Sequence, residues 1–288
     1  MKPKILIQLD TDQQPSVFDA VVAIDAGADH LLRHGGVTPA KVRDLVHGAL
    51  FTRSPAELHA TAIFVGGSDV AAGEAVLEAV KATFFGPFKV SVLFDANGAN
   101  TTAAAAALAA LQSMGGSLQG VSAGVLAATG PVGHRASRLL CRLGAKVAVG
   151  SRSLDRARGL ADTLRHSTGG AVTPFAAIGD AELTEALQGT SVIISAGAAG
   201  VPLLTASVWR NLPALKTLID LNAVPPLGIE GVEAAAKDTV LGTVHTWGAL
   251  GVGGTKMKIH KKAIQELFTS NDKILDAEQV LDLARSLG

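Results

Sequence analysis

A glycine-rich turn carries the most specific chemistry in this sequence. It runs Ala-Thr-Gly-Pro-Val-Gly over residues 128–133, between a hydrophobic run and a segment of helical character. In the related Gly-x-Gly-x-x-Gly fingerprint, the second glycine lets the backbone approach a diphosphate, and the third lets a helix pack on a strand. N–H groups at the helix N-terminus bind the anion. Ala128 replaces the first glycine, and a tight turn without a ligand is the alternative. The residues predicted to bind a dinucleotide here are Thr129, Gly130, Pro131, Val132 and Gly133.

The end of the next predicted strand indicates which dinucleotide is bound. NAD enzymes place an acid there to bind the ribose 2′-hydroxyl, and residues 149–153 contain none. Ser151 can donate a hydrogen bond to a phosphate, and the planar guanidinium of Arg152 can pair with it. We therefore predict NADP as the cofactor. If Asp155 pairs with Arg152 instead, Arg152 is an ordinary surface charge.

Polar residues also follow other predicted strands, where ligands of open α/β domains bind. Asp19 lies near a predicted helix start, and a carboxylate there can accept from N–H groups of a ligand or simply cap the helix. Helix capping explains Asn100 as well as ligand binding does. The substrate-binding candidates are Asp19, Asn100, Thr102 and Asn222. Further cofactor-lining candidates are Ser195, Ala196, Gly197 and again Asn222.

The elements that position these residues alternate between short β-branched runs and longer Ala/Leu-rich segments. This order predicts an α/β fold with two α/β domains and a cleft between them, the second domain being a Rossmann-type doubly wound parallel sheet. Glycines after the Ala-rich helix expected over 102–114, with Asn100 or Thr101 as its N-cap, suggest a boundary. The expected divisions are an N-terminal α/β domain over 1–116, a nucleotide-binding domain over 117–254, and a helical segment over 255–288 that packs back on the first domain.

Composition excludes several classes of protein. The 25 Lys and Arg balance 25 Asp and Glu, so a basic nucleic-acid binder is not expected. The single cysteine, Cys141, is expected in the core, and it can form neither an intramolecular disulfide nor a thiol cluster for a metal. The eight histidines show no ligand spacing, so we expect no metal. Apolar runs end well before the roughly 20 residues that span a bilayer. These features, with no targeting peptide visible, predict a cytoplasmic protein without membrane partners.

Several longer strings resemble the bacterial methylene-tetrahydromethanopterin dehydrogenases, and most closely their NADP-dependent branch. The resemblance covers nearly the whole chain. It is carried by the glycine turn and by Asp10-Thr11-Asp12, Phe84-Phe85-Gly86-Pro87-Phe88, Asn97-Gly98-Ala99-Asn100-Thr101-Thr102-Ala103, Asp220-Leu221-Asn222-Ala223-Val224-Pro225-Pro226 and Gly248-Ala249-Leu250-Gly251-Val252-Gly253-Gly254. Ala128 and Ser151 are local departures from the pattern.

The resemblance implies reversible hydride transfer from the methylene carbon of a reduced pterin to NADP+, in one-carbon metabolism. The pterin is methylene-tetrahydromethanopterin, and some members also accept methylene-tetrahydrofolate. A neighbouring nitrogen supplies electrons as the hydride leaves, so no general base is required, and positioning is the main task. Lys256 stands in a matching position after the Gly248–Gly254 segment, which is expected to be a flexible loop. Lys256 is thus a substrate contact and the one catalytic candidate. The family also implies a homo-oligomer, with a trimer expected.

The residue patterns alone are compatible with two other functions. A shikimate-type NADP-dependent dehydrogenase would use a Lys/Asp pair in the first domain, and the available lysines, Lys41 and Lys81, are not expected on loops at the site. A non-catalytic NADP-sensing module would bind the nucleotide without turning over a pterin.

Overall fold

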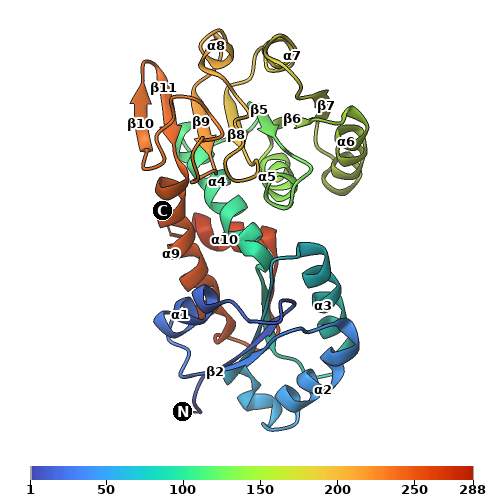
Figure 1. The fold of residues 1–288 in the computed structure, drawn as a ribbon. Coiled ribbons are helices and arrows are strands. Elements are labelled where there is room, and N and C mark those ends of the chain that lie inside the picture. The colour runs from blue at the N-terminus through green and yellow to red at the C-terminus, as the bar shows by residue number, and fades with distance from the viewer. Residues whose placement is uncertain (1, 288) are drawn as a thin grey trace. The chain divides into compact units, whose positions relative to one another are not determined.

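A computed structural model describes residues 2–287 and divides the chain into two compact units, each built around its own sheet (Figure 1). Unit 1 contains residues 1–101 and 257–288, and unit 2 contains Thr102–Lys256. The chain passes between the units within two helices, α4 (Ala99–Ser113) and α9 (Ala249–Leu267). The expectation of an α/β fold with two α/β domains is confirmed.

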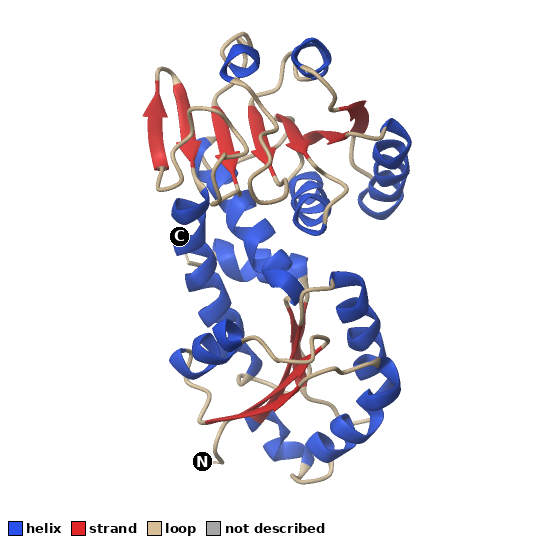
Figure 2. Ribbon diagram, in the orientation of Figure 1, coloured by secondary structure: helices blue, strands red, loops and turns tan. Residues whose placement is uncertain are grey.

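Unit 1 has a five-stranded parallel sheet in the order β12-β4-β3-β1-β2. Helices lie on both faces of this sheet (Figure 2). All six residues of β3 are buried, as expected for a central strand covered on both sides. The strands are β1 (Ile5–Asp10), β2 (His30–His34), β3 (Thr61–Gly66), β4 (Ser91–Phe94) and β12 (Ile274–Leu275). The elements that surround them are α1 (Val17–Asp25), α2 (Pro39–Leu50), α3 (Val70–Thr83), α10 (Ala277–Arg285) and the 3₁₀ turns η1 (Pro55–Ala60) and η2 (Ala96–Gly98).

Unit 2 has a seven-stranded sheet in the order β10-β11-β9-β8-β5-β6-β7, of which only the β10–β11 pair is antiparallel. The chain order reverses at β5, whose neighbours are β8 and β6, which makes the carboxyl end of β5 a topological switch point. The strands are β5 (Ser122–Leu126), β6 (Lys146–Ser151), β7 (Val172–Ala176), β8 (Val192–Ser195), β9 (Thr217–Asp220), β10 (Lys237–Leu241) and β11 (Val244–Trp247). The helices are α5 (Pro131–Arg142), α6 (Leu154–Thr168), α7 (Asp180–Ala186) and α8 (Ala206–Trp209).

The boundaries between the units differ from the expected ones. Gly115 and Gly116, with φ of 70° and 87°, follow the end of α4, whereas the division falls earlier, between Thr101 and Thr102. The later division lies between Lys256 and Met257 rather than at residue 254. Residues 257–288 belong to unit 1, and β12 adds a strand to its sheet by pairing with β4.

The segment expected to be a flexible glycine loop, Gly248–Gly254, instead leads into and forms the first turns of α9. A Cβ on Gly248 would lie 2.0 Å from the carbonyl oxygen of Glu233, and one on Gly251 would lie 2.0 Å from that of Ala236. The expectation was wrong because glycine here permits close packing of a helix on neighbouring backbone rather than flexibility. The antiparallel pair β10–β11 just before it was not predicted.

Candidate active site

The turn between β5 and α5 has the geometry that its glycines predict. A Cβ on Gly133 would lie 2.6 Å from the Ala127 carbonyl oxygen and 2.8 Å from the Ala128 Cα, so only glycine fits at this contact between helix and turn. Gly130 is not restricted in the way that Gly133 is. Its φ of −78° suits any residue, and a Cβ built at this position would contact only the Ala127 carbonyl oxygen, at 3.4 Å. The chain itself therefore gives no steric or conformational reason for glycine at 130.

The N-terminus of α5 is open to an anion. Gly130 is the N-cap residue and provides no side-chain acceptor for the first-turn N–H groups, and Pro131 is the first helical residue. These N–H groups have no partner within the helix, and the helix dipole adds a partial positive charge there. Ala128, in the place of the first glycine, is fully buried, and its N–H donates to the Gly150 carbonyl oxygen at 2.9 Å.

The end of β6 lies beside this turn. The hydroxyls of Thr129 and Ser151 are 3.4 Å apart, so two predicted cofactor residues from different loops are brought together. Arg152 is exposed, and Asp155 pairs with Arg158 at 3.2 Å. Within residues 2–287 Arg152 has no salt-bridge partner, so the alternative in which Asp155 neutralises it is not what the structure has.

The loops after β8 and β9 complete a connected group in unit 2. The Ala196 N–H donates to the Leu126 carbonyl oxygen at 3.2 Å, which places the predicted Ser195–Gly197 segment at the end of β5. The amide oxygen of Asn222 accepts from Val224 N–H at 2.9 Å and from Gly200 N–H at 3.4 Å, and its Nδ2 donates to Pro226 O at 3.1 Å. Asn222 thus shapes the loop that contains the cis Pro225-Pro226 bond.

Asp220, the last residue of β9, is a site residue that the sequence analysis missed. Its buried carboxylate accepts from the N–H groups of Asn222 at 3.1 Å and Ile229 at 2.9 Å, and so holds both ends of the loop. Burial raises the pKa of the Asp220 carboxyl, and the hydrogen bonds from backbone N–H groups oppose that rise. The sequence feature that could have identified Asp220 is an acidic residue at the carboxyl end of an otherwise apolar strand.

In unit 1 the predicted candidate Asp19 lies in the first turn of α1, as expected. Its N–H donates to the Ser16 hydroxyl at 3.2 Å, so Ser16 caps the helix and Asp19 is not the capping residue. The Asp19 carboxylate is therefore not committed to that cap.

Asn100 and Thr101 are not N-cap residues of α4, contrary to prediction, because the helix begins earlier, at Ala99. The buried carboxylate of Asp95 accepts from Asn100 N–H at 2.9 Å, Thr101 N–H at 3.0 Å and the Thr101 hydroxyl at 2.6 Å. Asn100 is fully buried, and its Nδ2 donates to Phe94 O at 2.6 Å and Asp276 Oδ1 at 2.8 Å.

The remaining candidates, Thr102 and Lys256, lie inside helices and at the limits of unit 2. Thr102 is the first residue of this unit, within α4, and Lys256 is its last, within α9. Both are partly exposed.

The two lysines considered for a shikimate-type mechanism are placed differently from each other. Lys81 pairs with Glu78 at 2.7 Å on α3. Lys41 donates to the Gly36 carbonyl oxygen at 2.8 Å, in the loop after β2, so it lies at the carboxyl edge of the sheet. Neither lysine lies on a loop, as expected, because Lys41 is in α2. That helix begins five residues after β2 ends, so its first turn keeps the Lys41 side chain at that edge.

Comparisons with known proteins give one family model that matches within unit 1 and two relatives that align over the whole chain. The family model described as "Methylene-tetrahydromethanopterin dehydrogenase, N-terminal" matches residues 17–97. The protein named "Bifunctional protein MdtA" of Methylorubrum extorquens is 46% identical over 287 residues, covering 100% of both chains. The "NAD(P)-dependent methylenetetrahydromethanopterin dehydrogenase" of the same organism is 31% identical, covering 99% of this chain and 98% of the other.

Solved structures at low identity show the fold alone. Shikimate 5-dehydrogenase from Listeria monocytogenes, solved with shikimate and NAD, is 13% identical with a TM-score of 0.51, covering 99% of this chain and 96% of the other. Ornithine carbamoyltransferase from Pyrococcus furiosus is 14% identical with a TM-score of 0.59, covering 92% and 84%. Enzymes of unrelated chemistry thus share this architecture, and the function has to be argued from the site.

Proposed function

The chain belongs to the methylene-tetrahydromethanopterin dehydrogenase family, and on that premise we propose that it is an NADP-dependent oxidoreductase acting on a reduced pterin. The proposed reaction transfers a hydride reversibly from the methylene carbon of methylene-tetrahydromethanopterin to NADP+ and leaves the methenyl pterin. Methylene-tetrahydrofolate is proposed as a second substrate. The proposal rests on full-length similarity to two relatives, at 46% identity to the bifunctional protein and 31% identity to the protein named as a methylenetetrahydromethanopterin dehydrogenase.

The β5–α5 turn supports dinucleotide binding by its geometry. Gly130 has no intrachain reason to be glycine, and it caps a helix whose N-terminus lacks a side-chain acceptor. These features fit a diphosphate that approaches the backbone closely. We assign the diphosphate to Thr129–Gly133, and the ribose side to Ser195, Ala196, Gly197 and Asn222. When bound, NADP+ supplies the hydride acceptor, its nicotinamide ring.

The preference for NADP is assigned to Ser151 and Arg152. Ser151 is held beside Thr129 at the end of β6, and the guanidinium of Arg152 is exposed without a salt-bridge partner among the described residues. A 2′-phosphate would provide the missing anion and form a charge-assisted pair with Arg152.

The chain's contribution to the chemistry is positioning. Asp19, Thr102, Asn222 and Lys256 are proposed to orient the pterin, and Asn100 to hold the Asn97–Thr102 segment in shape through its bonds to Phe94 and Asp276. Asp220 holds the Asn222 loop at both ends. No residue is required to remove a proton, because the neighbouring nitrogen supplies the electrons that stabilise the product. Among these residues, Lys256 is the one candidate for a catalytic residue, as a side chain that contacts the pterin during hydride transfer.

An anaerobic absorbance assay tests the proposal. Purified protein is given methylene-tetrahydromethanopterin or methylene-tetrahydrofolate, each with NADP+ or NAD+. We expect rapid formation of methenyl product with NADP+, and the ratio of the two pterin rates measures substrate preference. NADP+ binding without turnover of either pterin would contradict the proposal and favour a sensing module.

The placement of Lys41 at the carboxyl edge gives the shikimate-type alternative one specific observation in its favour. The Lys41→Ala variant separates the two enzymes. Pterin turnover should survive this substitution, and oxidation of a hydroxy acid such as shikimate should not occur in the wild type. Shikimate oxidation that is lost in Lys41→Ala would instead support the alternative.

Assembly and location are also part of the proposal. Among the described residues, no helix is both long and apolar enough to cross a bilayer. We propose that identical copies assemble into a trimer in the cytoplasm. Light scattering coupled to size-exclusion chromatography would give the mass of the assembly, and the mass of a single chain would overturn this part of the proposal.

A further inference from the structure

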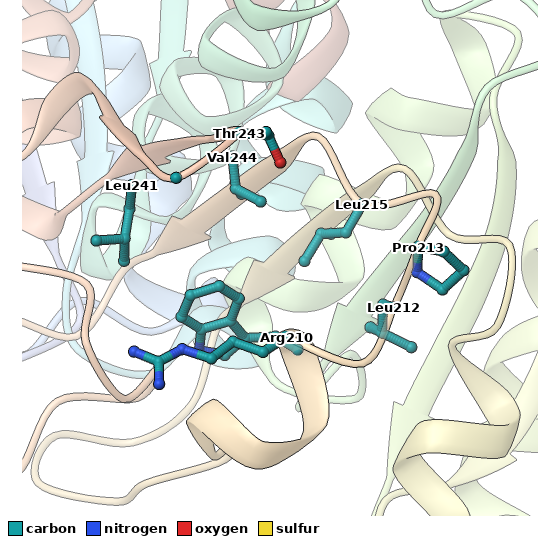
Figure 3. A pocket seen from close by; sticks show the side chains of 9 residues that line it. Arg210, Leu212, Pro213, Leu215, Leu241, Thr243 and Val244 are labelled. Carbon is teal, nitrogen blue, oxygen red and sulfur yellow. The ribbon is translucent and has the colours of Figure 1, made fainter.

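A pocket of about 420 Å³ lies in unit 2 (Figure 3). It is formed by the segment after α8 and by the turn between β10 and β11. Its lining residues are Trp209, Arg210, Leu212, Pro213, Leu215, Leu241, Gly242, Thr243 and Val244. The volume falls within the roughly 300–1,000 Å³ of small-molecule sites.

This pocket lies at the edge of the sheet opposite the proposed nucleotide site. Leu215 precedes β9, and Val244 begins β11, which runs parallel to β9. The pocket is therefore at the amino ends of these strands, whereas Ser195 and Asn222 lie at the carboxyl ends of β8 and β9. A ligand here would not compete with a dinucleotide.

The floor of the pocket is apolar and built from the core of unit 2. Trp209, Leu212, Leu215 and Val244 are each no more than 7% exposed and belong to one hydrophobic cluster. The Trp209 indole N–H is satisfied by the Glu230 carbonyl oxygen at 2.9 Å, so the indole needs no further acceptor from a ligand. About half of the accessible lining of the pocket is apolar, so the pocket can accommodate the apolar part of a ligand that also has a polar group.

Arg210 is the only charged residue among those that line the pocket. Its guanidinium carbon lies 5.2 Å from the centroid of the Trp209 ring. This cation–π contact favours a position of the guanidinium beside the indole. Within residues 2–287 Arg210 has no salt-bridge partner. The exposed guanidinium is therefore available to pair with an anion.

We propose that this pocket binds a small amphipathic anion, whose apolar body rests on Trp209, Leu215 and Val244 and whose single acidic group pairs with Arg210. The exposed Thr243 adds a hydroxyl to the lining on the side of the pocket away from the guanidinium (Figure 3). The proposal does not depend on the proposed function, since the two sites lie at opposite edges of one sheet.

Fluorescent probes test the proposal in full-length protein, first without NADP+ and then after NADP+ is added to saturation. The anionic probe is 8-anilinonaphthalene-1-sulfonate, and the neutral probe is N-phenyl-1-naphthylamine. We expect the anionic probe to bind one site per chain and to remain bound when NADP+ is added. Arg210→Gln should raise its Kd at least about tenfold, the effect of losing a charge-assisted bond, and should leave the Kd of the neutral probe unchanged.

Two further variants control for charge and for the pocket itself. Arg43→Gln removes an exposed arginine from α2 in unit 1 and should bind both probes like the wild type. Leu241→Trp fills the half-buried wall of the pocket and should weaken both probes. Thermal unfolding of each variant verifies the native fold, because this anionic probe also binds partly folded states.

Three results would overturn the proposal. The first is unchanged affinity of Arg210→Gln for the anionic probe, and the second is displacement of that probe by NADP+. The third is absence of binding to the native wild type. None of these results affects the pterin assay, so this proposal and the proposed function can fail separately.

Discussion

The N-termini of α4 and α5 offer a direct comparison, because both helices follow a parallel strand at the carboxyl edge of a sheet. At α4, the buried carboxylate of Asp95 accepts from the N–H groups of Asn100 and Thr101. At α5, Gly130 occupies the cap and provides no acceptor. One helix end is already bound to a carboxylate of the chain itself, and the other has no such acceptor. This difference in capping is what the proposed diphosphate site at α5 requires.

Removing the internal anion should have the largest effect on stability. Asp95→Ala leaves two buried N–H groups and the Thr101 hydroxyl without their acceptor. We expect the free energy of unfolding to fall by about 3 kcal/mol, as for the loss of charge-assisted hydrogen bonds in the core. Urea denaturation measures this change. NADP+ affinity of the folded variant should be unchanged, and a loss of affinity would contradict the division of roles between the two helix ends.

A carboxylate introduced at the N-cap of α5 should occupy its first-turn N–H groups, as Asp95 does at α4. Gly130→Asp adds a capping carboxylate where a Cβ fits, so stability should change by less than about 0.5 kcal/mol. The Kd for NADP+ should rise about 100-fold, because the carboxylate occupies the N–H groups and repels a diphosphate.

Gly130→Ala is the matched control for this substitution, since it adds the Cβ without the charge. It should raise the Kd by roughly tenfold, through the methyl group alone. Isothermal titration calorimetry gives both values. Wild-type affinity in Gly130→Asp would mean that this helix end does not bind the cofactor.

Substitution of Arg152 tests whether the proposed nucleotide site prefers NADP+ over NAD+. Arg152→Ala should weaken NADP+ binding by about 1.5–3 kcal/mol, the contribution of a charge-assisted hydrogen bond, and leave NAD+ binding nearly unchanged. Steady-state kinetics with both cofactors measures the ratio. Arg158→Ala, which removes an arginine paired with Asp155 on the same helix, is the control. Equal losses with both cofactors would remove the assignment of Arg152 to the 2′-phosphate.

Asp220 extends the comparison to a buried carboxylate that holds a loop instead of a helix. Burial raises its pKa in the folded state, so between the unfolded pKa of about 3.9 and the higher folded pKa the native protein binds more protons than the unfolded chain. The contribution of Asp220 to stability therefore falls as the pH rises through this window.

Asp220→Asn removes this titration and provides the test. The stability of the wild type relative to Asp220→Asn should be greater at pH 4.5 than at pH 7.5, by a small margin. Urea denaturation at both pH values checks the sign. A difference that is constant with pH would show that Asp220 does not titrate in this window.

Local patterns in the sequence predicted most of the elements. Ser16 caps the helix over Val17–Asp25, and Asp276 caps the last helix, with its carboxylate accepting from Ala277 N–H at 2.8 Å. The strand–turn–helix arrangement at residues 128–133 could be predicted because its glycines and the flanking strand and helix are all within one short segment. Alternation and capping depend on neighbouring residues, and the sequence contains that information.

Only the tertiary structure decided which polar groups are already satisfied. Asn100 matches a ligand-binding string, yet its amide donates to Asp276, a residue 176 positions later. Gly251 resembles part of a flexible loop, yet it lies in α9, and glycine is needed there because a Cβ would be only 2.0 Å from the Ala236 carbonyl oxygen. The same holds for Lys41 at the carboxyl edge of the unit 1 sheet. Such contacts join segments that are far apart along the chain, so the spacing of residues determined the types of chemistry available, and packing determined which groups remain available for a ligand.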